Sequence, residues 1–430
     1  FGVCRFVLAW LLVACTTARK YRGDPHSNSN STRQAAIAVS DKYAADVAEE
    51  ILLAGGNAVD AAVATGFALA VTYIDAGNIG GGGFMLIHMD GKPYFLDYRE
   101  TAPMRAHRDM FLDEDGNVVK NSTLIGPRAA GVPGTVAGFW AAHQKFGKLP
   151  WSEVLAPAIR LAKAGFVPAN KLATDVQSHF DWFGTSTNFK AHFGNLKAGE
   201  IFKQPALAET LARIAINGQD EFYTGETSKL IVNQMKRDGG LIDAADLAEY
   251  KAIWREPLRA SWREYQILSA PPPSSGGFGV IQLLKMKDYL ADAFRNIEHN
   301  SPQYVHLVAE MEKRVFADRA EYLGDPAFVD IDMTALISDT YIERRAKEVN
   351  PENISRLEDV APGLESPNTT HYSILDGDGN AVSNTYTINW AFGSGVVVSG
   401  GGFLLNNEMD DFSAKPGVPN IFGVVGNTAN

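Results

Sequence analysis

The tripeptide Asn368-Thr369-Thr370 contains a peptide bond that can break to create its own catalyst. If the bond between Asn368 and Thr369 is cut, Thr369 gains a free α-amine next to its own hydroxyl. That amine has a reference pKa of about 8, so much of it can act as a base near neutral pH. A base and a nucleophile on one residue can begin acyl transfer without a separate histidine. Alone, the tripeptide is more typical of a polar turn before a strand, so its surroundings decide.

The residues that follow Thr369 predict a β-hairpin that brings a second hydroxyl to it. Strands over 370–375 and 381–388 flank an Asp- and Gly-rich turn, and folding them about that turn sets Thr369 opposite Thr387. Directly opposed residues share one face of a sheet, with Cβ atoms about 5 Å apart. A slip of one residue would move Thr387 to the other face. The polar segment 357–368 predicts an exposed stretch in which a scissile bond can lie.

The rest of the chain predicts helices that surround a smaller number of strands. Apolar residues recur at helical spacing from Asp41 onward, and the other predicted helices cover 58–72, 151–164, 204–216 and a stripe from Tyr304 to Val315. The helix over 58–72 is apolar on nearly every side and is therefore expected to be buried. Strands over 84–89 and 94–98 flank Asp90-Gly91, which predicts a hairpin.

Four consecutive glycines, Gly80 to Gly83, precede the first strand of that hairpin. A glycine run can cradle phosphate, but this one lacks the Lys-Ser/Thr pair of a P-loop and the spacing of a dinucleotide-binding turn. Close packing of the backbone beside a sheet is the favoured interpretation, and nucleotide binding is the alternative.

Composition indicates a globular protein for which no metal, cofactor or nucleic acid is predicted. The 430 residues are 46% hydrophobic and carry a net charge of −11, and no basic run is present that would attract nucleic acid. The two cysteines, Cys4 and Cys15, lie at the N-terminus, so the body of the protein can hold no disulfide and no thiolate metal site. The histidines are scattered, and His371 is expected to be structural.

The N-terminal residues 1–15 have the pattern of a targeting segment. Arg5 precedes an apolar run that is too short to span a bilayer. The run ends in Leu-Val-Ala-Cys15, which resembles a bacterial lipoprotein signal with Cys15 as the acylated residue; an ordinary cleaved signal is the alternative. Residues 16–33 are polar and suit a flexible tether. The prediction is a periplasmic or cell-envelope location, with membrane contact only through a lipid anchor.

Motifs spread from about residue 34 to the C-terminus occur in the order of one known family. They are Gly77–Phe84, Asp97–Pro103, Gly131–Val136, Pro271–Gly277, Ala317–Pro326, Thr369–Ser373 and Leu405–Ser413. Each motif is weak alone, but together they are specific. The chain resembles γ-glutamyltranspeptidase, also called glutathione hydrolase, of the N-terminal-nucleophile (Ntn) hydrolase superfamily, and it is similar to the bacterial members.

The resemblance implies an α+β fold, the four-layer αββα sandwich of Ntn hydrolases. It also implies a precursor that cuts itself into a large subunit, 34–368, and a small subunit, 369–430 in this chain, which remain bound as a heterodimer. In the family's pattern Thr369 is the nucleophile and Asn368 ends the large subunit. Thr387 matches the threonine that hydrogen-bonds the nucleophile, in agreement with the hairpin register.

The resemblance also implies how the carboxylate of a γ-glutamyl substrate is bound. Arg99 matches the family's carboxylate-binding arginine, and a planar guanidinium can meet a carboxylate with two parallel hydrogen bonds. A structural salt bridge between Arg99 and Glu100 or Asp97 is the alternative.

Further residues match the family's contacts to the substrate ammonium and its lid. Asn389, Glu408 and Asp411 match the residues around the α-ammonium, although the pair Asp410-Asp411 alone is more typical of a solvated turn. Phe422 falls where bacterial members carry a lid aromatic that gates the site. An apolar plug in a surface loop is the alternative for Phe422.

The implied reaction is two-step covalent catalysis. Thr369 first attacks the carbonyl of Asn368, which cuts the chain, and then the γ-amide of glutathione or another γ-glutamyl compound. The γ-glutamyl group passes to water or to an amino-acid or dipeptide acceptor. One alternative is a cephalosporin- or glutaryl-acylase-like amidase, although those relatives usually carry Ser where Thr369 stands. Another is a non-catalytic surface lipoprotein of the same fold.

The chain departs from the family's pattern at its end. It stops at Asn430, within the lid region, whereas the family continues into a Ser-Ser pair and a Gly-Gly pair that help bind the substrate carboxylate and form the oxyanion hole. Removing one oxyanion donor costs roughly 10²–10³ in rate. We therefore expect an incomplete sandwich, and a 430-residue chain that is poorly soluble or unprocessed when expressed alone.

Overall fold

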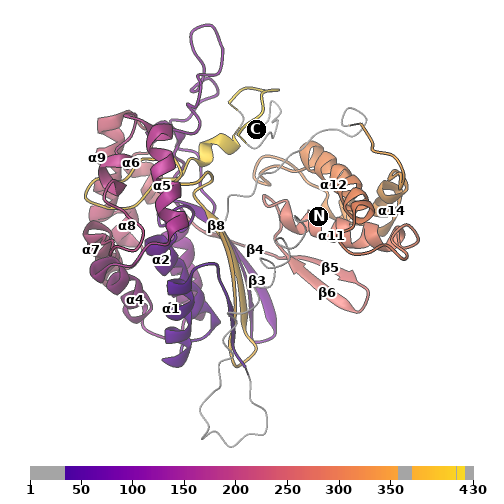
Figure 1. Ribbon diagram of the computed structural model, residues 1–430, viewed down its shortest axis with the longest axis horizontal. Coiled ribbons are helices and arrows are strands. Elements are labelled where there is room, and N and C mark those ends of the chain that lie inside the picture. The colour runs from indigo at the N-terminus through magenta and orange to yellow at the C-terminus, as the bar shows by residue number, and fades with distance from the viewer. Residues whose placement is uncertain (1–33, 357–369, 413, 422–430) are drawn as a thin grey trace, which may run out of the picture.

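A computed structural model describes residues 34–356, 370–412 and 414–421, which form two lobes (Figure 1). The larger lobe holds an antiparallel sheet with helices packed against one face. The smaller lobe comes from the middle of the chain and lies on the opposite side of the sheet in Figure 1.

Six strands form the main sheet in the order β1, β7, β8, β2, β3, β4. Their bounds are Ala36–Ala38 (β1), Thr370–Leu375 (β7), Ala381–Thr387 (β8), Gly82–Met89 (β2), Lys92–Asp97 (β3) and Ile253–Arg255 (β4). The hairpin β7–β8 from late in the chain is thus inserted between strands from its beginning. A second, two-stranded sheet pairs Leu258–Trp262 (β5) with Tyr265–Ser269 (β6).

The β7–β8 hairpin has the register predicted from its sequence. Thr370, the first described residue of β7, pairs with Tyr386 of β8. One residue further along β8, Thr387 pairs with Gly82 of the neighbouring strand β2. Asn368 and Thr369 lie outside the described residues, so the register is established up to the residue that follows Thr369.

The predicted helices are confirmed, with ends shifted by at most a few residues. In the larger lobe they are α1 (Lys42–Leu53), α2 (Ala58–Thr72), α3 (Thr135–Phe146), α4 (Trp151–Ala164), α5 (Asn170–Phe183), α6 (Phe189–Phe193), α7 (Pro205–Asn217), α8 (Asp220–Tyr223), α9 (Glu226–Asp238) and α10 (Ala244–Glu249). In the smaller lobe they are α11 (Gly276–Tyr289), α12 (Pro302–Tyr322), α13 (Met333–Leu336) and α14 (Asp339–Lys347).

Helix α2 is the centre of the larger core, as its all-round apolar sequence predicts. Every residue of α2 is buried. Two tyrosines from the hairpin attach the sheet to it: the Tyr372 hydroxyl donates to the carbonyl of Ala62 (2.8 Å) and the Tyr386 hydroxyl to that of Gly66 (2.9 Å). Buried hydroxyls need partners, and these bonds fix the height of β7 and β8 against the helix.

The other face of the hairpin is polar and only partly covered. His371 and Ser373 of β7 and Thr385 of β8 lie on it, and His371 Nδ1 is 2.7 Å from Thr385 Oγ1, which is consistent with a structural histidine. Side chains alternate between the faces of a strand, so Thr387 shares this open face. The α+β class is confirmed; of the two stacked sheets expected in an αββα sandwich, the described residues form one large sheet.

The glycine run is explained by close backbone packing. A Cβ added at Gly80 would lie 2.1 Å from the carbonyl oxygen of Leu404, and one at Gly81 would lie 2.1 Å from that of Thr387. Both distances are far inside van der Waals contact, so only glycine lets the segment before β2 pass so close to the end of β8.

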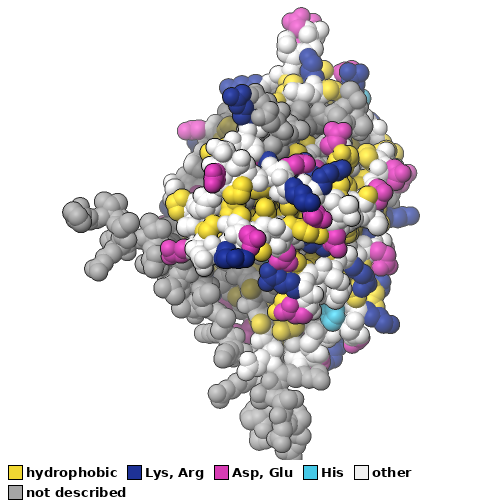
Figure 2. Space-filling view, turned by 90° about the vertical axis from the view of Figure 1, so that its right-hand side faces the viewer, with side chains coloured by type: hydrophobic (Ala, Val, Ile, Leu, Met, Phe, Trp, Pro, Cys, Tyr) yellow, Lys and Arg dark blue, Asp and Glu magenta, His cyan; other side chains and the backbone are white. Residues whose placement is uncertain are grey.

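The smaller lobe has a hydrophobic core of its own. Phe278 and Met286 of α11 pack with Leu307 and Met311 of α12, and other apolar residues of α14 complete the cluster. Figure 2 views the molecule from the side of this lobe and shows charged side chains of both signs among apolar ones. Within the described ranges, no helix has the length and apolar character needed to cross a membrane.

Candidate active site

The end of β8 places Thr387 and Asn389 beside the start of β7. Asn389 adopts a left-handed backbone conformation (φ 71°), which asparagine tolerates better than most residues. This bend lets its backbone N–H donate to Thr387 Oγ1 (2.9 Å), while its side-chain Nδ2 donates to the carbonyl of Asn407 (2.9 Å). Both predicted site residues are therefore held in place by hydrogen bonds.

Two neighbouring asparagines for which the sequence predicted no role connect the segments around the site. Asn406 Nδ2 donates to the carbonyls of Gly80 and Gly131, and its Oδ1 accepts from the backbone N–H groups of Gly131 and Glu408, all at 2.9 Å. Asn406 and Asn407 are both completely buried. Consecutive amides inside a motif that is otherwise acidic were the signal that could have identified them.

A short 3₁₀ turn, Glu408–Asp411, brings two carboxylates to Arg99 at the end of β3. Arg99 Nη2 lies 2.7 Å from Glu408 Oε1 and also pairs with Asp411. Burial would lower the pKa of Arg99, but the two carboxylates outweigh it and raise the pKa, so Arg99 remains a cation. Both ion pairs use Nη2, and the N–H groups on Nη1 and Nε are the ones suited to a further carboxylate.

The alternative partners considered for Arg99 are wrong. Asp97 instead pairs with Arg255 of β4 (2.7 Å), and its contact with Arg99 is to the backbone N–H (3.0 Å). Glu100 points into the protein, and none of the described residues hydrogen-bonds its carboxylate. The expected local salt bridge is replaced by one that joins positions far apart in the chain.

The acidic pair is not a solvated turn either. Asp410 is 3% exposed, and its carboxylate accepts from Thr123 Oγ1 (2.6 Å) and from the backbone N–H of Ile421 (3.0 Å). Its neighbour Asp411 points the other way, toward Arg99. The two aspartates therefore have separate functions: one fixes the turn and the other faces the cluster.

Glu100 is a site residue that the sequence analysis treated only as a salt-bridge partner. Its side chain is buried, and both carboxylate oxygens lack a hydrogen-bond partner within the described part of the chain. Burial, together with the like charge of Glu408, raises its pKa well above the ordinary value. An unpartnered buried carboxyl is costly, and the quoted motif Asp97–Pro103 contained it without any spacing signal for this role.

The cluster holds more carboxyl groups than cations. Burial raises the pKa of Glu408 to about 7, although the Arg99 charge acts in the opposite direction, and Glu408 Oε2 also lacks a partner among the described residues. Arg99 can therefore bind a carboxylate while the neighbouring acids accept an ammonium. This is a site for a zwitterion such as the head of an α-amino acid.

Other predicted site residues cannot be placed. Asn368, Thr369, Phe422 and Cys15 lie outside the described ranges. Asn389, Glu408, Asp411 and Arg99 are brought together, as the resemblance implied, with Thr387 next to Asn389. Within the described ranges, no group of three or more His, Cys, Asp or Glu side chains has the arrangement of a metal site.

Comparisons with known proteins agree with this geometry. The family model described as Gamma-glutamyltranspeptidase matches residues 44–430. The glutathione hydrolase proenzyme of Pseudomonas aeruginosa is 60% identical over 395 residues, covering 92% of this chain and 71% of the relative. A solved γ-glutamyltranspeptidase of Pseudomonas nitroreducens, complexed with L-DON, is similar with a TM-score of 0.74 and 56% identity, covering 76% of this chain and 98% of that one.

A more distant relative corresponds to one of the alternatives. The acylase ACY 1 proenzyme of a Pseudomonas species is 37% identical over 392 residues, covering 89% of this chain and 70% of the relative. The glutathione hydrolase proenzyme is thus clearly closer to this sequence. The chain belongs to the γ-glutamyltranspeptidase family.

Proposed function

We propose that this chain is a γ-glutamyltransferase and glutathione hydrolase whose nucleophile, Thr369, is freed by cleavage after Asn368. The observation that carries the proposal is the zwitterion-matched cluster of Arg99, Glu408 and Asp411 close to the end of β8. The register supports it, because one further residue on β7 would set Thr369 opposite Thr387 on the open face of the sheet.

The proposed reaction uses the α-amine of Thr369 as the base. The Thr369 hydroxyl attacks the γ-carbonyl of the donor, and its proton passes through the amine to the departing amine. The γ-glutamyl ester that forms is then attacked by water or by an acceptor amine, which restores the threonine. Thr387 donates or accepts a hydrogen bond at the nucleophile and so orients it.

The proposed substrates are glutathione and other γ-glutamyl compounds, with amino acids or dipeptides as acceptors. Arg99 binds the α-carboxylate, and Asn389, Glu408 and Asp411 surround the α-ammonium. The large subunit is 34–368 and the small subunit begins at Thr369. A signal segment at 1–15, a tether at 16–33 and acylation of Cys15 would place the heterodimer in the periplasm or at the cell envelope, and Phe422 would cover the site.

The choice of donor tests the proposal against the acylase alternative. The 4-nitroanilides of γ-glutamate and of glutarate share the same amide, and only the first carries the α-ammonium and α-carboxylate together. We expect kcat/KM for the γ-glutamyl compound to be at least about 100-fold higher, because the glutaryl compound leaves buried charged groups without partners. Equal rates would instead identify an acylase, and the measurement is release of 4-nitroaniline.

Glu408 is expected to make donor binding depend on pH. Its pKa of about 7 means that the carboxyl carries a proton below that pH and is an anion above it, and the anion is the form that attracts an ammonium. The KM for the γ-glutamyl anilide should therefore fall roughly tenfold between pH 6 and pH 8. Glu408→Gln should have a higher KM that no longer changes over this range, and an unchanged pH dependence in this variant would contradict the assignment.

The same shift has the opposite sign for stability. The pKa of Glu408 is raised on folding from 4.5 to about 7, so the folded state retains a proton that the unfolded state releases. This contribution to the free energy of unfolding is fully present below pH 4.5 and is lost as the pH rises through 7. Activity and stability therefore change in opposite directions as Glu408 ionises.

A further inference from the structure

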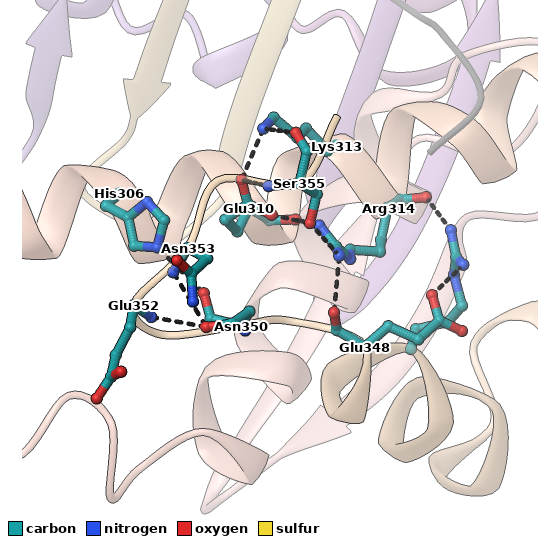
Figure 3. Close-up of polar contacts among 10 residues, drawn as sticks. His306, Glu310, Lys313, Arg314, Glu348, Asn350, Glu352, Asn353 and Ser355 are labelled. Carbon is teal, nitrogen blue, oxygen red and sulfur yellow. Dashed lines mark hydrogen bonds and ion pairs between the residues drawn. The ribbon is translucent and has the colours of Figure 1, made fainter. Parts of the chain in front are cut away.

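A short extended segment of the large subunit lies along α12 just before the undescribed residues 357–369. Its contacts advance along the helix: the carbonyl of Asn350 is 3.1 Å from His306 Nε2, and Ser355 is bound about one to two turns further on by Glu310 and Arg314. Figure 3 shows this segment passing across the face of α12 with its polar groups turned toward the helix. We call residues 350–355 the strap.

Three side chains of α12 bind every polar group of one strap residue, Ser355. Its backbone N–H donates to Glu310 Oε1 (3.1 Å), its carbonyl accepts from Lys313 Nζ (2.9 Å), and its hydroxyl accepts from Arg314 Nη2 (2.8 Å). Figure 3 shows the three side chains converging on Ser355. A residue held through its backbone as well as its side chain cannot slide along the helix, so its position is defined.

The cluster that binds Ser355 is itself rigid. Glu310 and Arg314 are 1% and 3% exposed, and they pair at 2.7 Å within the helix. Arg314 also donates to the carbonyl of Glu348 (2.7 Å). Burial alone would raise the pKa of Glu310, but hydrogen bonds from Lys313, Ser355 and Arg314 bring it to about 2. A buried ion pair is costly unless its hydrogen bonds are satisfied, and the strap supplies some of them.

The position of Ser355 gives this cluster a role beyond packing. The chain is fixed again at Thr370, where β7 begins, and the bond after Asn368 lies between these two points. We infer that Glu310, Lys313 and Arg314 are positioning residues for self-cleavage: they anchor the strap at Ser355 and so direct the intervening segment toward the open face of the sheet. This inference rests on the proposed function, because it assumes cleavage before Thr369.

The size of the effect separates positioning from mere shortening of a loop. If the strap were released, the free segment before Thr370 would begin near Asn350 instead of Ser355. Loop-closure entropy depends only weakly on length, so that change alone would slow cleavage by less than about twofold. Misplacing a reacting group by even a small distance can cost up to about 100-fold. A loss of tenfold or more therefore reports the direction of the chain.

The test uses Ser355→Pro, which removes the N–H that binds Glu310 but leaves the buried ion pair intact. The protein, expressed from its complete reading frame, is isolated uncut and its conversion into two bands is followed by electrophoresis. We expect the rate constant of self-cleavage to fall at least about tenfold. Ile354→Pro is the matched control, because it introduces the same ring at an exposed neighbour and should change the rate less than about twofold.

Two further measurements exclude a merely structural explanation. Once cleaved, the Ser355→Pro protein should hydrolyse the γ-glutamyl anilide with the unaltered kcat and KM, and its melting temperature should differ by no more than about 3 °C. Ser355→Ala keeps both backbone contacts and should retain most of the cleavage rate. Equal rates for the Ser355→Pro and Ile354→Pro proteins would overturn the inference. If the unaltered protein does not cut itself before Thr369, the proposed function fails instead.

Discussion

Replacement of Thr369 by alanine is expected to leave a single uncut chain with no measurable γ-glutamyl hydrolysis. The hydroxyl of Thr369 is the proposed attacking group in both reactions, so its loss removes the cleavage and the later ester together. Removing a nucleophile typically costs at least about 10⁴-fold in rate. Electrophoresis reports the uncut chain, and release of 4-nitroaniline from the γ-glutamyl anilide reports the activity.

Two neighbouring variants make the result specific to the hydroxyl of Thr369. Thr369→Ser keeps a hydroxyl and should still cut itself. Thr370→Ala removes the adjacent buried threonine of β7 and should also cut itself, because Thr370 has no role in the chemistry. Cleavage at the same bond in Thr369→Ala would refute the assignment, and an unaltered protein that stays uncut would favour the non-catalytic alternative.

Substitution of Arg99 by methionine is expected to raise the KM for the γ-glutamyl anilide by about 10³-fold. Truncating one partner of a buried, hydrogen-bonded charge pair costs about 2–5 kcal/mol, and here two carboxylates, Glu408 and Asp411, lose their cation at the same time as the substrate loses its anchor. Most of the loss should appear in KM because the contact is present before the reaction begins. Arg99→Lys should recover only part of it.

Arg255 offers a matched control for the loss of stability. It pairs with Asp97 at 2.7 Å and is about as exposed as Arg99, but its partner lies outside the zwitterion cluster. Arg255→Met should therefore lower the melting temperature while leaving the KM within about threefold. An equal rise in KM for both variants would show that Arg99 acts through the fold alone.

The hairpin and its register could be predicted from the sequence because both depend on local information. The Asp- and Gly-rich turn sets the point about which the strands fold, and alternation then decides which side chains share a face. The helix over 58–72 was equally clear, because a segment that is apolar on every side has only one favourable environment. The glycine run was assigned to packing, but its neighbours Leu404 and Thr387 could not be read from the pattern.

The site itself could not be built from spacing. The residue that Arg99 binds at 2.7 Å, Glu408, is 309 positions away, whereas spacing favoured the adjacent acids. The family resemblance brought Arg99, Glu408 and Asp411 into one proposal, but it did not predict that Glu100 would be buried without a partner. Burial of a charged side chain depends on what covers it, and only the folded chain contains that information.

The order of strands in the main sheet has a consequence for how the molecule can be assembled. The hairpin β7–β8 is bonded to β1 on one side and β2 on the other, so a cut just before Thr370 would leave the second piece threaded between two parts of the first. The pieces could then separate only by breaking backbone pairing along both edges. Folding before the cut is an encounter within one chain, whereas folding after it would require two chains to meet and interleave. Cleavage would thus make folding a one-way event, in which a molecule that later unfolds is lost.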